Sequence, residues 1–326
     1  MLTLVTGATG FVGSAVARTL LARGHRLRLL VRPRGNRANI AGLDAELAEG
    51  DLTDPASLAR AADGCRYLVH VAADYRLWVP DPAAMMRANV DGTRALLLAA
   101  QSRGVERMVY CSSVAALGLI GDGTPADEAT PVHEDKIIGT YKLSKYRAEQ
   151  AVLALVRDHA VPAIIVNPST PVGPRDIKPT PTGRMIRDAA AGRMPAYVDS
   201  GLNIVHVDDV AEGHVLALER GQIGERYILG GEDMPLSKVF ALAAAAGGKK
   251  PPAISLPIAP LIPLALVCEA LARVGVEPLV TREMLAMARK KMFFSSAKAR
   301  RYLGYAPRPA GQAITDAAAW FAAHAC

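Results

Sequence analysis

Short apolar runs alternate with longer amphipathic segments along the first half of the chain. The short runs predict buried strands, and the longer segments, with apolar residues at helical spacing, predict helices. Strands are expected at residues 2–5, 27–31, 45–48, 67–71, 107–111 and 161–166. Helices are expected at 14–23, from Asp54 onward, at 85–102 and around 139–145. This alternation predicts an α/β fold with a doubly wound parallel sheet.

The alternation stops near residue 175. Helices are expected at 184–191, 236–246, 261–274 and 281–290, with short strands near 204–207 and 227–229. We therefore predict two domains. Residues 1–175 form the sheet domain, and residues 176–326 form a smaller, mainly helical lobe for substrate, from which some strands and helices return to the first domain. The smaller lobe is expected to fold over the carboxyl edge of the sheet, where such folds bind ligands.

Composition narrows the class of protein. Of 326 residues, 51% are hydrophobic and 21% are charged, with a net charge of +7. No basic run is interleaved with aromatic residues, which argues against a nucleic-acid partner. The four cysteines show no Cys-x-x-Cys pair and no histidine at metal-ligand spacing, so neither a metal site nor a disulfide framework is predicted. Free thiols and an N-terminus without the basic region of a signal peptide favour a cytoplasmic location.

One apolar stretch leaves alternatives open. Residues 254–268 are strongly apolar, but they fall short of the roughly 20 residues that a membrane span needs, and three prolines interrupt them. No transmembrane span is therefore predicted. We expect a buried loop and helix start in the smaller lobe. The alternatives are an apolar wall for the substrate or a surface that touches a membrane.

A glycine-rich loop follows the first predicted strand. Thr6-Gly-Ala-Thr-Gly-Phe-Val-Gly13 places glycines three residues apart between a strand and a helix. Glycines at this point permit a tight turn and close approach of the backbone to a pyrophosphate, and the helix start offers free N–H groups. The loop predicts a dinucleotide-binding site.

The end of the second strand bears on the choice of cofactor. NAD-binding folds usually place an acidic residue there, for the ribose hydroxyls. This chain instead has Arg32-Pro33-Arg34. Arginines suit a 2′-phosphate, so NADP is favoured over NAD, and a solvated basic loop is the alternative. After the third strand, Asp51 lies where a carboxylate could reach the adenine amino group.

Tyr141 and Lys145 stand four residues apart on a predicted helix, so their side chains share one face. By itself this spacing is usually a surface pair. An ammonium beside a phenol favours the phenolate, and we expect the lysine to lower the tyrosine pKa towards neutrality. Such a tyrosine could exchange a proton with a hydroxyl or carbonyl oxygen. Ser112 and Ser113 end the fifth strand at the ligand edge of the sheet.

Other residues are expected at the same edge. Ala72 and Ala73 follow the fourth strand and let the backbone pass close under a cofactor. The loop from Asp74 through Tyr75 to Trp78 is expected to supply pocket wall. Asn89 lies in an apolar helical stripe and needs polar partners, which a relay beneath the site could supply. The proline-rich stretch 167–174 is expected to clamp the nicotinamide end.

Ser113, Tyr141 and Lys145, downstream of the glycine loop, resemble the extended short-chain dehydrogenase/reductase superfamily over essentially the whole chain. Val205-His-Val-Asp-Asp-Val210 is a further similarity. Within the superfamily, residues 72–78, 139–146, 167–175 and 295–305 look most like the hopanoid-associated sugar epimerases, which are close relatives of dihydroflavonol-reductase-like proteins.

The resemblance implies roles for individual residues. Tyr141 would be the general acid/base, Lys145 would hold the nicotinamide ribose, and Ser113 rather than Ser112 would hydrogen-bond the reacting oxygen. The cofactor would lie on Gly7, Thr9, Gly10, Phe11, Val12, Gly13, Arg32, Asp51, Leu52, Ala72, Ala73, Tyr141, Lys145 and Pro168. The substrate, sugar-like or partly apolar, would meet Asp74, Tyr75, Trp78 and Thr170. A homodimer through a four-helix interface is also implied.

The reaction is left between two alternatives. Dehydration is disfavoured, because dehydratases of the family carry an acidic pair where this chain has Val114-Ala115. An NAD(P)-dependent sugar epimerase, with a possible hopanoid link, is one reading. Thr170, where many epimerases place an asparagine, and Arg32, where an acid would suit NAD, favour a net NADPH-dependent reductase instead. A sensor that binds NADP without chemistry is a third class, disfavoured by the intact Tyr141–Lys145 pair.

Overall fold

The computed structural model describes residues 1–76, 79, 81–272 and 280–324. Its centre is a seven-stranded sheet in the order β10-β6-β5-β4-β1-β2-β3, with every neighbouring pair parallel. The strands are β1 (Leu2–Thr6), β2 (Arg26–Val31), β3 (Glu46–Glu49), β4 (Tyr67–His70), β5 (Arg107–Cys111), β6 (Ala163–Pro168) and β10 (Arg226–Leu229). The predicted doubly wound α/β fold is confirmed.

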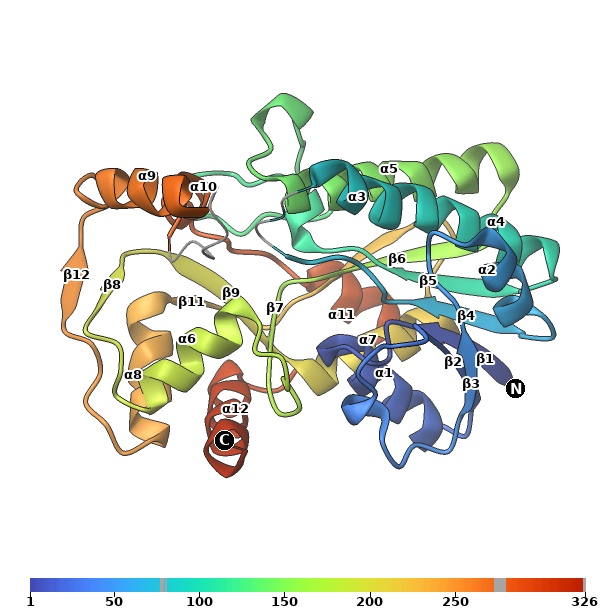
Figure 1. Ribbon diagram of the computed structural model, residues 1–326, viewed down its shortest axis with the longest axis horizontal. Helices are drawn as coiled ribbons and strands as arrows, with labels where there is room; N and C mark the ends of the chain where they lie inside the picture. Colours follow the sequence, from blue (N-terminus) through green and yellow to red (C-terminus); the bar gives the residue numbers. More distant parts are fainter. Residues whose placement is uncertain (77–78, 80, 273–279, 325–326) are drawn as a thin grey trace.

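Helices cover both faces of this sheet (Figure 1). One face carries α1 (Phe11–Ala22), α7 (Val207–Arg220) and α11 (Ala297–Leu303). The other carries α2 (Pro55–Ala62), α4 (Gly92–Ser102) and α5 (Thr140–His159). Alternate strand residues serve the two apolar cores, because side chains alternate across a strand: Leu4 packs with α2, α4 and α5, whereas Val5 packs with α1 and α7.

Short elements connect β4 to α4 and β5 to α5. Helix α3 (Pro82–Met86) runs into a π-helical turn, Arg87–Asp91, and then into α4. The remaining short turns are 3-10 helices at Ala38–Ile40, Val114–Ala116 and Glu134–Lys136. The expected helix 85–102 is thus three consecutive pieces with a wide turn in the middle.

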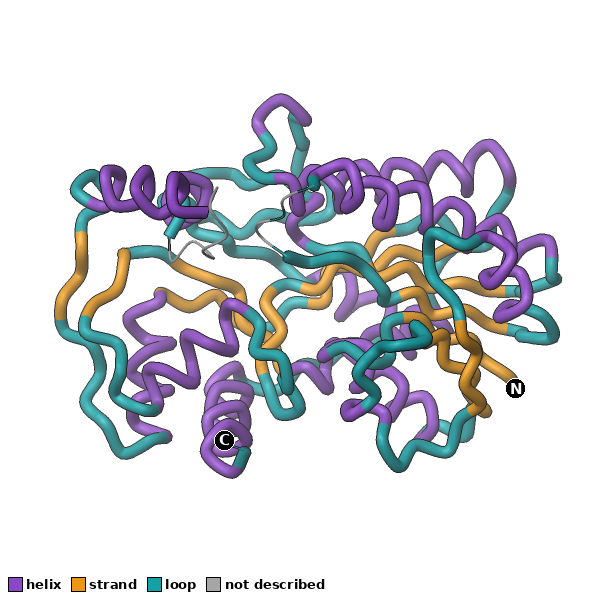
Figure 2. Tube along the Cα trace, viewed as in Figure 1, coloured by secondary structure: helices purple, strands orange, loops and turns teal. Residues whose placement is uncertain are grey.

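The smaller lobe has its own core. A three-stranded sheet has the order β11-β9-β7, and β12 pairs with β8. These strands are β7 (Thr170–Val172), β8 (Ala196–Val198), β9 (Gly201–His206), β11 (Glu232–Pro235) and β12 (Ile254–Leu256). Helices α6 (Pro181–Ala190), α8 (Leu236–Ala246) and α12 (Ala310–Ala323) pack with the three-stranded sheet. The tube in Figure 2 shows this lobe beside the large sheet.

Two further helices, α9 (Leu261–Ala272) and α10 (Arg282–Ala288), lie at the outer end of the smaller lobe (Figure 1). The expectation of a buried segment here is wrong for the described part of α9. Of its residues with a described exposure, Ala265 is buried and most of the others are exposed. Across the described residues, no helix has the length and apolar character that crossing a membrane requires.

Candidate active site

The glycine loop brings two backbone segments into close contact. Gly7, directly after β1, has a φ of +76°, and a Cβ there would lie 2.5 Å from the amide nitrogen of Ala72. A Cβ on Gly13 would lie 2.1 Å from the carbonyl oxygen of Gly7. Only glycine fits at either position. The loop therefore lies directly against the chain that leaves β4, where Ala72 and Ala73 follow.

The start of α1 is open to an anion. Gly10 occupies the N-cap, no side chain within the described ranges caps the helix, and the first turn, which holds Phe11 and Val12, carries no acid. The first N–H groups and the positive end of the helix dipole are thus available. The loop is also anchored from outside, because the side-chain amide of Asn39 donates to the carbonyl oxygen of Thr9 over 3.3 Å.

The ends of β2 and β3 carry the groups expected at the adenosine half of a cofactor. Arg32 is exposed, and its charge lowers the pKa of both Asp51 and Asp74. For Asp51 the main causes are hydrogen bonds from the backbone N–H and hydroxyl of Thr53. Leu52 is half-buried beside them. Arg37, in contrast, is held by an ion pair with Glu49 at 2.8 Å.

These observations test whether the chain fits a dinucleotide. A glycine cradle with no room for a Cβ, an uncapped helix start and exposed arginines after β2 make a suitable donor set for a pyrophosphate and a further phosphate. The residues present therefore fit a nicotinamide dinucleotide.

Tyr141, Lys145 and Ser113 converge at the carboxyl edge of the sheet. Tyr141 lies in the first turn of α5, and Lys145 follows one turn later. Ser113 follows β5, and its side chain hydrogen-bonds the phenol of Tyr141 while accepting from the N–H of Ala115 over 3.1 Å. The buried hydroxyl of Ser112 has no hydrogen-bond partner among the described residues. The serine chosen from the sequence is therefore the one in contact with the tyrosine.

The expected lowering of the tyrosine pKa is wrong for the protein alone. Burial raises the pKa of Tyr141 to about 12, and the hydrogen bond from Ser113 opposes this only in part. The ammonium of Lys145 is directed elsewhere. It donates to the carbonyl oxygen of Cys111 over 2.8 Å and to the hydroxyl of Tyr110 over 3.2 Å. Burial lowers the pKa of Lys145, and Cys111 and Glu149 oppose that shift.

A buried carboxylate, which the sequence interpretation missed, is connected to both Lys145 and Ser113. Glu149 is fully buried one turn beyond Lys145 on α5. Its carboxylate accepts from Asn167 over 2.7 Å and pairs with Arg226 of β10 at 3.3 Å. Asn167 also donates to the carbonyl oxygen of Ser113 over 3.1 Å. Both partners of the amide nitrogen are acceptors, so Asn167 ties α5 to the end of β5. The only signal in the sequence was the four-residue spacing after Lys145.

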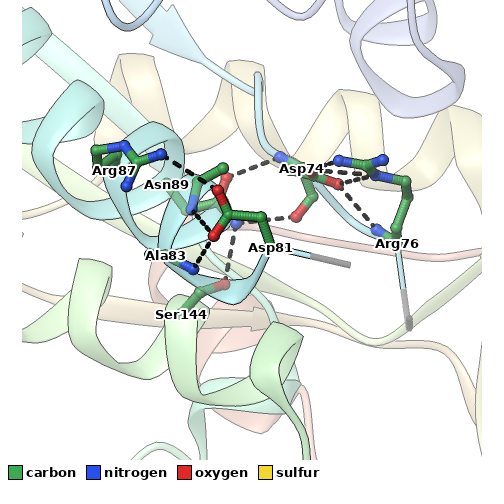
Figure 3. Close-up of polar contacts among 8 residues, drawn as sticks. Asp74, Arg76, Asp81, Ala83, Arg87, Asn89 and Ser144 are labelled. Carbon is green, nitrogen blue, oxygen red and sulfur yellow. Dashed lines mark hydrogen bonds and ion pairs between the residues drawn. The ribbon is translucent and has the colours of Figure 1, made fainter. Parts of the chain in front are cut away.

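Asn89 joins the loop after β4 to helix α5 (Figure 3). Its amide nitrogen donates to the carbonyl oxygen of Asp74 over 2.8 Å and to the hydroxyl of Ser144 over 2.9 Å. Its amide oxygen accepts from the N–H of Asp74 over 2.7 Å. The polar partners predicted for Asn89 are present, but they hold backbone and helix together and include no atom of Tyr141 or Lys145. Asp74 itself pairs with Arg76.

The residues expected at the substrate are placed unevenly. Pro168 ends β6 and Thr170 begins β7, while Tyr75 is 43% exposed. Trp78 lies outside the described residues. Burial raises the pKa of Tyr75, and so does the charge of Asp176, whereas Arg184 lowers it. The charges of Asp176 and Arg184 therefore act on Tyr75, and the sequence interpretation assigned neither residue to the site.

Arg175 adds strain at the same place. It has a φ of +72°, which non-glycine residues rarely adopt, and an ion pair with Asp208 holds its side chain. Its neighbour Asp176 accepts hydrogen bonds from the N–H and hydroxyl of Thr180, and no described residue partners the other carboxylate oxygen. A strained residue beside an unsatisfied buried oxygen is typical of a binding site, and the stretch 175–184 belongs to the candidate site on that ground.

Fold and site together define an α/β enzyme of the short-chain dehydrogenase/reductase type. The NAD dependent epimerase/dehydratase family matches residues 3–230, and the chain belongs to that family. It is 44% identical over 325 residues to a Synechocystis protein named "Putative dihydroflavonol 4-reductase", covering 98% of this chain and 94% of the relative.

Two further proteins are similar to the chain over almost its whole length. Sterol demethylase protein B of Methylococcus capsulatus is 34% identical over 324 residues, with 98% of each chain covered. The crystal structure of gox2253 is 69% identical, superposes with a TM-score of 0.90, and covers 99% of this chain and 98% of its own. The protein is thus an enzyme of this family, and an NAD(P) cofactor is typical of it.

Proposed function

We propose that the protein is an NADPH-dependent reductase that converts a ketone or aldehyde group of a partly apolar substrate into an alcohol. The observation that carries this proposal is the partly buried phenol of Tyr141, hydrogen-bonded to Ser113 and with a pKa raised to about 12. At neutral pH such a phenol keeps its proton. It is suited to give a proton to a carbonyl oxygen and poorly suited to take one from an alcohol. An epimerase must begin by taking one.

A nicotinamide dinucleotide held at the glycine loop would supply the hydride that the carbonyl carbon of the substrate needs. The hydroxyl of Ser113 hydrogen-bonds the carbonyl oxygen and fixes it beside Tyr141. The phenol of Tyr141 gives its proton to that oxygen as negative charge develops there, which leaves a C–H bond, an O–H bond and a phenolate. The ammonium of Lys145 donates to Cys111 and Tyr110, but it still adds a positive charge one helical turn from the phenolate until solvent returns the proton.

The cofactor preference rests on Arg32. It follows β2, it is exposed, and neighbouring carboxylates are within reach of its charge. A guanidinium here would bind a 2′-phosphate through charge-assisted hydrogen bonds, with Arg34 close by in the chain. No acidic side chain follows β2 to favour the ribose hydroxyls of NAD. These residues support NADP over NAD.

A partly apolar substrate is supported by the relatives and by Tyr75. Two relatives bear the names of a dihydroflavonol reductase and a sterol demethylase protein, both of which refer to largely apolar ring systems. Tyr75 offers an aromatic surface within reach of the charges of Asp176 and Arg184, which could bind a polar end of the same molecule. The second candidate, an epimerase of a sugar-like substrate, is favoured by the name of the matching family, and the hopanoid link stays a prediction.

Product analysis with NADPH separates the candidates. We expect stoichiometric loss of NADPH with cyclic ketones such as a dihydroflavonol or a 3-ketosteroid, and little activity with NADH. Inversion of a sugar stereocentre without net loss of NADPH would overturn the reductase and establish the epimerase. Tyr141→Phe is the matched control: NADPH binding with no turnover excludes contaminating enzymes and a sensor without chemistry.

A further inference from the structure

One face of α9 is apolar and exposed. Leu264, Val267 and Leu271 follow one another at intervals of three and four residues, so they share one side of the helix. Their exposed fractions are 46%, 57% and 47%. We call these three side chains the α9 face, and Leu266, 47% exposed, adds apolar surface on another side of the helix. Large apolar side chains gathered at this density are unusual on a surface that meets only water.

The α9 face carries no charge. The sequence of the helix contains a single charged residue, Glu269. Its carboxylate turns to α10, where it pairs with the guanidinium of Arg282 at 2.9 Å and accepts from the backbone N–H of the same residue over 2.7 Å. The one acidic group of the helix is therefore compensated by a neighbour and does not repel an anionic surface.

The apolar surface begins before the helix. Ile254 and Leu256 of β12 are 59% and 36% exposed, and the chain leads from this strand directly to α9 at the outer end of the smaller lobe (Figure 1). Among the described strands, β12 pairs with β8 alone.

In the sequence, basic residues lie on both sides of the segments that form this apolar surface. Residues 249–291 contain seven arginines and lysines against three acidic residues. Arg289, Lys290 and Lys291 are exposed directly after α10, which packs against α9. An uncharged apolar helix face flanked by a basic excess is the composition of segments that lie on anionic bilayers, with the apolar side chains among the acyl chains and the cations at the phosphates.

We propose that the α9 face, with Arg289, Lys290 and Lys291, binds the surface of an anionic lipid bilayer. The contact is peripheral, because α9 is too short to span a bilayer. A second copy of the chain is a poorer occupant. A two-fold contact through α9 would bring two positively charged segments together, and like charges across an interface are costly. Lipid binding does not require the reductase activity, so the two proposals fail independently.

Vesicle sedimentation with the full chain tests the proposal. We expect the protein to pellet with phosphatidylcholine vesicles that contain phosphatidylglycerol, to bind pure phosphatidylcholine weakly, and to be released by high salt. Val267→Gln/Leu271→Gln should lower the partition coefficient by about ten-fold or more, because two large apolar side chains leave the bilayer. Lys290→Gln/Lys291→Gln should weaken binding to the anionic vesicles only.

Matched controls exist elsewhere on the surface. Leu47→Gln/Ile223→Gln removes two comparably exposed apolar side chains, and Arg60→Gln/Arg94→Gln removes two exposed charges. Both should bind vesicles like the parent, and an unchanged melting temperature verifies folding of every variant. Absence of binding to anionic vesicles, or equal binding by the α9 variant, overturns the proposal. A dimer in light scattering that Val267→Gln/Leu271→Gln dissociates would assign the face to a second copy instead.

Discussion

At the scale of single residues, Tyr141 has the most direct consequence. Replacing Tyr141 by phenylalanine removes the proton donor but keeps the ring that packs at the start of α5. We expect kcat to fall by about 100-fold or more, within the range for loss of a general acid, with the dissociation constant of NADPH little changed. Stopped-flow turnover and fluorescence titration of NADPH measure the two quantities. Turnover within a few-fold of the parent would contradict the proposed role.

Arg32 should decide between the two cofactors. Arg32→Ala removes a charge-assisted contact to a 2′-phosphate, so KM for NADPH should rise by about ten-fold or more while KM for NADH stays nearly constant. Initial rates with each cofactor give both values. Arg37→Ala is the control, because Arg37 is already paired with Glu49. An equal loss with both cofactors would show that Arg32 acts only on folding.

Glu149 should set the alkaline limit of activity through Lys145. Its charge raises the lysine pKa against burial, so Glu149→Gln should lower that pKa further, and the ammonium is then lost at lower pH. The alkaline limb of the kcat/KM profile should move to lower pH. Glu225→Gln, which affects a partly exposed pair with Lys298, should leave it in place. A uniform drop of the profile without displacement would assign Glu149 a purely structural role.

At the scale of elements, the π-helical turn 87–91 places Asn89 so that one side chain serves two segments. The turn directs the amide at the backbone of Asp74 and at Ser144 of α5. Asn89→Ala would leave the N–H of Asp74 without this acceptor. We expect a loss of about 1–3 kcal/mol in the free energy of unfolding and a higher KM for substrate, since the loop that carries Tyr75 loses its anchor. Urea denaturation and initial rates measure these effects, and Asn36→Ala serves as an exposed control.

The elements that the sequence predicted well share one property. The strands of the large sheet are apolar runs bounded by turn residues, and the glycine loop follows one of them at a fixed distance. Helix α7 was missed because β9 passes into it at His206 and Val207 without a turn, and the helix is buried on several sides. The strand at 227–229 was found, but its partner β6 is far away in the sequence, and short-range patterns contain no information on such pairing.

The residues of the candidate site also divide into those that the sequence could predict and those that it could not. The glycines, Ser113, Tyr141 and Lys145 have fixed spacings next to predictable elements, so they could be named from the sequence. Asn167 and Arg226 could not, because they meet Glu149 only after β6 and β10 pair in the large sheet. The direction of the Tyr141 pKa was also missed. Spacing alone shows that a lysine is near, whereas the degree of burial and the direction of the ammonium come from packing.

At the scale of the whole molecule, polar contacts tie the C-terminal segment to the junction of the two lobes. The backbone N–H and guanidinium of Arg308 donate to Asp209 in the first turn of α7. Three residues before Asp209, at the end of β9, His206 lies 3.3 Å from Asp316 of α12. Helix α7 packs on the large sheet and α12 belongs to the core of the smaller lobe, so these contacts limit how far one lobe can move relative to the other.

Two buried histidines should make the whole fold sensitive to acid. Burial lowers the pKa of His70 to about 3 and that of His214 to about 4. His70 hydrogen-bonds Thr6 and Thr93, and the Thr93 hydroxyl donates to the carbonyl oxygen of Asn89. Because the Thr93 hydroxyl gives its proton to Asn89, the Thr93 oxygen can only accept a hydrogen bond from Nε2–H of His70. The other ring nitrogen, Nδ1, therefore carries no proton and accepts from the hydroxyl of Thr6. That directed chain links β1, β4 and α4, and it requires a neutral ring.

The direction of the pH effect follows from these values. Above pH 6.5 the histidines are neutral in both states, and their contribution is fully present. As pH falls from 6.5 towards 4, the unfolded chain binds protons that the folded protein cannot, so the free energy of unfolding decreases by up to about 1.4 kcal/mol per pH unit for each histidine. His70→Asn should be less stable at pH 7 but should show a shallower decline between pH 6.5 and 4 in urea denaturation. His133→Gln, on the surface, should keep the parent slope. An unchanged slope in His70→Asn would contradict this prediction. It would mean that His70 already carries a proton in the folded protein and that the hydrogen-bond chain through a neutral ring is wrong.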